Sequence, residues 1–132
     1  MSEPGLHRLS EIPGLKEAIA THGKASEKVV VAEIVAMLEA RGYRKPGKDT
    51  EGAIGFYVLA GQRNVHHSGS DSGVVDITVW RVGLTTWSIE VKRREVNTEI
   101  KASQWCLWRA GCIHLANTAD QVAELLDAGV SA

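Results

Sequence analysis

Two short stretches of alternating apolar and polar residues most constrain how this chain can fold. The first is VVDITVW, at residues 74–80, and the second is TWSIEVK, at residues 86–92. Successive side chains of a strand point to opposite faces, so each stretch predicts a strand with one apolar face. Gly83 lies between them and predicts a turn. The two stretches therefore form a candidate hairpin within a sheet.

The polar faces of this hairpin carry three charged residues. Asp76 lies in the first stretch, and Glu90 and Lys92 lie two residues apart in the second. If the strands pair, Asp76 comes close to both. Two carboxylates and an ammonium gathered at one edge of a sheet form a candidate divalent-metal site. The alternative without a function is a surface salt bridge across the hairpin, which would stabilise the fold by about 0–1 kcal/mol.

The rest of the chain supplies helices and further strands around this hairpin. Their order predicts an α/β (α+β) domain, residues 25–132, in which helices cover a central mixed sheet. Residues 1–24 read as an N-terminal extension, an appended arm or subunit contact. The expected elements are a short helix at 13–21, a helix at 27–41 with Ser26 as N-cap, a strand at 53–60, the two strands above, a helix from Thr98 to 110, a strand at 112–116 and a helix opened by a capping box of Thr118 and Gln121.

Asp76, followed fourteen residues later by Glu90-Val91-Lys92, resembles the D…(D/E)xK signature of the PD-(D/E)xK nuclease superfamily. With Gln104-Trp105 and Gly111, the pattern resembles the VRR-NUC branch of small phage-type and bacterial nucleases related to Holliday-junction resolvases. The resemblance covers roughly residues 26–126. Asp71 is a competing aspartate, but it lies in a polar, glycine-bearing loop, whereas a strand would hold Asp76.

The resemblance implies a restriction-endonuclease-like αβββαβ core and a DNA endonuclease that uses Mg²⁺, with Mn²⁺ as a substitute. Such an enzyme would act on branched, junction or flap DNA in replication, repair or recombination, as a homodimer. The implied metal ligands are Asp76, Glu90, the Val91 carbonyl and Glu27, and the implied catalytic residues are Asp76, Glu90, Lys92 and Gln104.

Two of these residues have a second interpretation. Glu27 is either a ligand or a favourable charge at a helix N-terminus, worth roughly 0.3–1 kcal/mol. Gln104 either orients water near the site or only covers the end of the sheet. Glu33, on another side of the same helix as Glu27, is expected to be solvated.

Basic residues provide candidate contacts to DNA phosphates. A net charge of −1 excludes a protein that simply coats DNA, but it leaves room for local basic clusters. A solvated face explains either cluster equally well. One cluster is Arg41, Arg44, Lys45 and Lys48, and the other is Lys92, Arg93, Arg94 and Lys101. The candidate DNA contacts near the site are Arg63, His67, Arg93, Arg94 and Lys101.

Composition fits a single globular domain. The chain has 132 residues, 44% of them hydrophobic, and no run long enough to span a membrane. Its first residues lack the apolar centre of a secretory signal, so a cytoplasmic location is expected. The resemblance implies that the cell is bacterial or phage-infected. Cys106 and Cys112 are expected to be small buried hydrophobes, and the tryptophans to lie in the core.

Two hypotheses compete with the nuclease. The first alternative is a catalytically silent DNA-binding module that keeps the fold. The intact triplet of Asp76, Glu90 and Lys92 argues against it. The second alternative is an accessory subunit of a repair, replication or restriction assembly, with the N-terminal extension as its contact. Cleavage assays with and without a divalent metal separate the enzyme from the silent module, and the size of the particle in solution addresses the third possibility.

Overall fold

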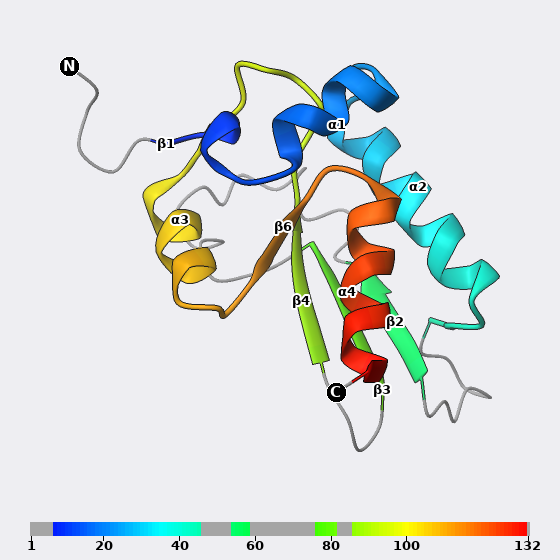
Figure 1. Cartoon of the computed structure of the whole chain (residues 1–132). Helices are drawn as coiled ribbons and strands as arrows, with labels where there is room; N and C mark the ends of the chain where they lie inside the picture. The colour runs from blue at the N-terminus through cyan, green and yellow to red at the C-terminus, as the bar shows by residue number, and fades with distance from the viewer. Residues whose placement is uncertain (1–6, 46–53, 59–75, 82–85, 132) are drawn as a thin grey trace.

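The computed structural model describes residues 7–45, 54–58, 76–81 and 86–131. Within them, a mixed sheet of four strands is flanked by helices, which confirms the predicted α/β class (Figure 1). No helix in these ranges is long and apolar enough to cross a membrane. The sheet strands are β2 (Ile54–Val58), β3 (Ile77–Arg81), β4 (Thr86–Val91) and β6 (His114–Ala116). The helices are α1 (Leu15–His22), α2 (Glu27–Ala40), α3 (Ala102–Arg109) and α4 (Ala119–Ser131).

The sheet has the order β2-β3-β4-β6. The pairs β2–β3 and β3–β4 are antiparallel, and the pair β4–β6 is parallel. The predicted hairpin is confirmed, since β3 and β4 pair in antiparallel fashion with Ile77 opposite Ile89. Ile77, Val79 and Ile89 are buried, as the alternation predicted. Helices α2 and α4 pack against each other beside the sheet (Figure 1).

Local sequence explains where α2 and α4 begin. The Ser26 hydroxyl accepts a hydrogen bond from the Val29 amide at 3.2 Å, which satisfies a donor that the first turn of α2 leaves unpaired. Before α4, the Gln121 amide donates to the Thr118 hydroxyl at 3.2 Å, and the Thr118 amide donates to Gln121 Oε1 at 3.1 Å. The predicted capping box is therefore confirmed.

The N-terminal segment packs into the protein instead of projecting from it. The two-residue strand β1 (His7–Arg8) pairs with β5 (Glu99–Ile100), and a 3₁₀ turn, η1 (Leu9–Glu11), follows it. These elements and α1 contribute to a second core, separate from the main one. The second core consists of Leu9, Ile12, Leu15, Ile100, Ile113 and Leu115. The described part of the extension, from His7 onward, is thus part of the packed structure.

Two expectations about the region after β4 are wrong. Thr98 does not cap a helix, because Glu99 and Ile100 form β5 and α3 begins only after Lys101. Ile100 is fully buried in the second core, and this burial outweighs the local helical pattern. The two cysteines, Cys106 and Cys112, are exposed instead of buried. Cys106 lies on α3, which has no fully buried side chain.

Candidate functional site

The candidate site lies where β3 begins and β4 ends. Asp76 directly precedes β3, and the pairing of Ile77 with Ile89 places Asp76 across from Glu90. The Val91 amide donates a hydrogen bond to Asp76 Oδ2 at 2.8 Å, which fixes the position of this carboxyl group. Two carboxyl groups from adjacent strands are therefore held together at one end of the hairpin.

Gln104, on α3, joins the glutamate of this pair to the lysine. Its Nε2 donates to Glu90 Oε2 at 2.9 Å, and its Oε1 accepts from Lys92 Nζ at 2.5 Å. One amide thus contacts an acidic and a basic group at once, and its orientation is fixed by both. Gln104 therefore belongs to the cluster of Asp76, Glu90 and Lys92. It does more than cover the end of the sheet, which was the other interpretation of this residue.

The protein environment strongly perturbs the ionisation of Glu90. Its side chain is buried, and this burial raises the pKa of the Glu90 carboxyl from 4.5 to about 8, with the negative charge of Asp76 acting in the same direction. The Lys92 ammonium opposes the rise in pKa but does not cancel it. Burial and the neighbouring Asp76 carboxyl therefore favour the protonated form of Glu90 more than water does.

The pKa of Lys92 is lowered, whereas that of Glu90 is raised. Burial lowers the pKa of its ammonium, although the carboxylates of Glu90, Glu27 and Asp76 act to raise it. Lys92 also lines a cavity of about 540 Å³ together with Glu27, Val91 and Arg93. Since Lys92 contacts Gln104 and Gln104 contacts Glu90, one layer of side chains connects this cavity to the carboxyl pair.

Glu27 lies in the first turn of α2 and faces the same cavity as Lys92. Its charge acts on the pKa of both Glu90 and Lys92, so it belongs to the same electrostatic cluster. Nevertheless, no three His, Cys, Asp or Glu side chains form a metal-binding group within the described ranges. Asp76 and Glu90 lie against each other, and Glu27 lines the adjacent cavity with Val91 and Lys92.

The predicted DNA contacts divide into three kinds. Arg93 and Lys101 are exposed, and Arg93 lines the cavity beside Lys92. Arg94 is buried, which corrects its assignment as a phosphate contact. Arg63 and His67 lie outside the described residues, as does the competing aspartate Asp71.

Arg94 instead forms the centre of a buried hydrogen-bond network. Its guanidinium donates to both Glu33 carboxylate oxygens, at 2.7 and 3.1 Å, and to the Gly23 and Asn117 carbonyl oxygens at 2.7 and 3.1 Å. Its backbone exchanges two hydrogen bonds with Ala25. Glu33 is therefore an ion-pair partner, not a simply solvated residue, and the pKa of its carboxyl is lowered by the bond to Arg94.

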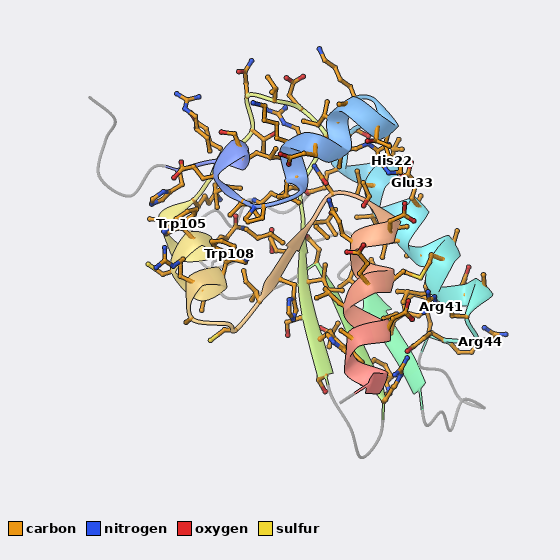
Figure 2. The ribbon with its side chains drawn as sticks, viewed as in Figure 1. His22, Glu33, Arg41, Arg44, Trp105 and Trp108 are labelled. Carbon is orange, nitrogen blue, oxygen red and sulfur yellow. The ribbon has the colours of Figure 1, made fainter. Side chains whose placement is uncertain are left out.

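The network around Arg94 was not predictable from local sequence. Arg93 and Arg94 are adjacent and chemically identical, and sixty-one positions separate Glu33 from Arg94. The other basic cluster lies elsewhere: Arg41 pairs with Asp127 at 2.8 Å, and Figure 2 shows Arg41 and Arg44 near the end of α2, beyond Glu33. Arg41 and Arg44 are therefore separate from the candidate site, and Lys48 lies outside the described residues.

Comparisons with models of known protein families, with curated proteins and with solved structures find no match to this chain. The resemblance to a nuclease superfamily therefore rests on the residues themselves and on the order of the elements.

The proton on Glu90 predicts how stability depends on pH. In the unfolded chain Glu90 ionises near pH 4.5, whereas in the folded protein it holds its proton up to about pH 8. The folded state therefore binds more protons in this window, and raising the pH from 4.5 to 8 favours unfolding. We expect Glu90→Gln, which cannot ionise, to lose this part of the pH dependence and to be more stable than the wild type above pH 8 in EDTA.

Urea unfolding of both proteins at pH 5 and pH 8.5 measures this effect. The difference in unfolding free energy between the variant and the wild type should grow with pH, by about 1.4 kcal/mol for each unit of pKa shift that operates. An equal difference at the two pH values would show that Glu90 ionises normally.

Proposed function

We propose that this chain is a metal-dependent DNA endonuclease of the PD-(D/E)xK type, with the restriction-endonuclease-like core and the VRR-NUC-like site. One observation carries the proposal: Asp76 and Glu90 lie side by side at the end of adjacent strands, and Gln104 joins Glu90 to Lys92. A structural salt bridge would lower the pKa of the carboxyl groups, whereas the pKa of Glu90 is raised. Strongly perturbed groups beside a cavity are characteristic of catalytic sites.

The donor set fits a hard divalent cation such as Mg²⁺ or Mn²⁺. Burial and the nearby Asp76 carboxyl both raise the pKa of Glu90, and a bound cation would offset both by stabilising the ionised carboxylate. Mg²⁺ is usually held by one or two carboxylates and keeps several waters, so a third acidic ligand is not required. Asp76 and Glu90 would be the principal ligands, with the Val91 carbonyl and Glu27 at the cavity side.

When bound, such a cation supplies a more acidic water and neutralises negative charge on the phosphate. The chain's own residues have distinct tasks around it. Lys92, with its lowered pKa, faces the cavity and holds or accepts a proton from the attacking water, or donates a hydrogen bond to the phosphate. Gln104 keeps the Lys92 ammonium and the Glu90 carboxylate in a fixed relation to each other.

The substrate we propose is DNA, with a preference for junctions, flaps or other branched forms. The exposed guanidinium of Arg93 beside the cavity, and exposed Lys101 before α3, would contact the backbone phosphates. Two cuts in one branched substrate favour a two-fold symmetric homodimer. Cleavage in replication, repair or recombination follows from that substrate class.

A cleavage panel tests the proposal. Four-way junction, flap, nicked and linear duplex DNA are each incubated with the full chain in Mg²⁺, Mn²⁺ or EDTA. We expect strand cleavage with either metal, fastest on a branched substrate, and none in EDTA. Cleavage that persists in EDTA would remove the metal from the mechanism. Binding without cleavage in either metal would identify a catalytically silent DNA-binding module instead.

A further inference from the structure

The position of Gln104 depends on the helix that carries it. Its side chain makes one hydrogen bond to Glu90 and one to Lys92, at 2.9 and 2.5 Å. Both bonds come from one planar amide, so a shift of α3 by about 1 Å would weaken both together. The attachment of α3 to the rest of the protein therefore controls the geometry of the charged cluster.

Helix α3 has little stability of its own. It spans eight residues, has no fully buried side chain, and its N-cap Lys101 makes no capping hydrogen bond through its side chain. Helices shorter than about 12 residues are marginal in water unless tertiary packing holds them. The packing available to α3 is the contact of Trp105, Leu107 and Trp108 with the second core.

The N-terminal segment supplies much of that second core and contacts α3 directly. Leu9 is fully buried there, and its amide donates to the Thr98 carbonyl at 2.9 Å just before β5. The His7 ring stacks on Trp105 with ring centroids 3.7 Å apart and an angle of 4° between the planes. Glu11 orients the His7 ring through a contact of 3.1 Å to Nδ1. Trp105 directly follows Gln104 in the chain, and Figure 2 shows it with Trp108 on α3.

We propose that the N-terminal segment, residues 7–15, is the positioning element of the active site, and that His7, by stacking on Trp105, holds Gln104 against Glu90 and Lys92. The role in catalysis rests on the proposed nuclease function. His7 acts through Trp105 and Gln104, so it is a positioning residue and touches no substrate. The segment that resembles an appended arm in the sequence thus completes the site.

The first test is a double-mutant cycle on cleavage of the best DNA substrate. We expect His7→Ala to lower kcat by about tenfold to a hundredfold, the scale of a misplacement near 1 Å, with KM little changed. His7→Phe keeps a stacking ring and should restore most of the rate. In a Gln104→Ala background, His7→Ala should cost nothing further, because the two residues act through one step.

The matched control is Ile19→Ala. Ile19 packs against the same second core from α1 but has no ring contact with α3. We expect this variant to lose stability, measured by urea unfolding, while its kcat stays near that of the wild type. A kcat for His7→Ala equal to the wild type, or a loss that adds in full to that of Gln104→Ala, would overturn the positioning role.

A second measurement does not depend on cleavage. The side-chain amide signals of Gln104, assigned by their disappearance in Gln104→Ala, are followed by NMR. In His7→Ala they should shift and exchange faster with water, and in Ile19→Ala they should not. If the wild type cuts no DNA, the proposed function fails alone, and these signals still test the positioning. Gln104 signals that are unchanged in His7→Ala contradict it.

Discussion

Asp76→Asn is expected to reduce metal-dependent DNA cleavage by about 10³-fold or more. A bound cation contributes several kcal/mol of charge stabilisation in the transition state, and each 1.36 kcal/mol corresponds to a factor of ten in rate. Asparagine has nearly the same shape as aspartate, and its carbonyl oxygen still accepts the bond that the Val91 amide gives to Asp76. The fold should therefore survive while the charge needed at the site is lost.

Three measurements define this outcome. Single-turnover cleavage gives the rate, isothermal titration with Mn²⁺ gives the metal affinity, and urea unfolding in EDTA gives the stability. We expect the rate and the affinity to fall while the unfolding midpoint does not. Glu39→Gln, which removes one exposed carboxylate near the end of α2, is the matched control and should leave all three unchanged. Normal cleavage by Asp76→Asn would refute the assignment of Asp76 as a ligand.

Arg94→Ala is expected to destabilise the folded protein by about 2–4 kcal/mol. The substitution removes a buried cation that pairs with Glu33 and donates to two backbone carbonyl groups, and those groups lose their partners. A loss of this size is a large fraction of the total stability of a single domain. Urea or thermal unfolding of the purified variant measures it.

The neighbouring residue provides the control for this prediction. Arg93 carries the same side chain but is exposed, and its Nε donates to the Thr98 hydroxyl at 3.1 Å. We expect Arg93→Ala to change the unfolding free energy by no more than about 1 kcal/mol. If the two substitutions lower the unfolding free energy equally, the network around Arg94 contributes no more to stability than the exposed Arg93 side chain does.

The contrast between these two arginines also marks the limit of prediction from sequence. Periodicity places Arg94 only after the end of a strand, as it does Arg93. Whether an arginine faces water or is buried against a carboxylate depends on which distant segments pack over it. For Arg94 these are Ala25, which precedes α2, Glu33 within α2, and Asn117, the residue after β6.

The sequence by itself determined the features that follow from short-range geometry. The two-residue period of strands placed Ile77 and Val79 on the buried face and put Asp76 on the opposite one. Side-chain caps, which reach only three residues, located the starts of α2 and α4. Each of these signals depends on bonds or alternation within a single element, so it holds where no distant contact overrides it, as one does after Thr98.

Tertiary structure alone decided the features that depend on distant partners. It drew Ile100 into a strand with His7 instead of a helix, because burial in the second core stabilises that conformation more than local propensity favours the helix. It also gave the N-terminal segment its contact with Trp105. Long-range packing joins residues that no local pattern links, since the free energy of burial depends on the whole fold and not on neighbours in the chain.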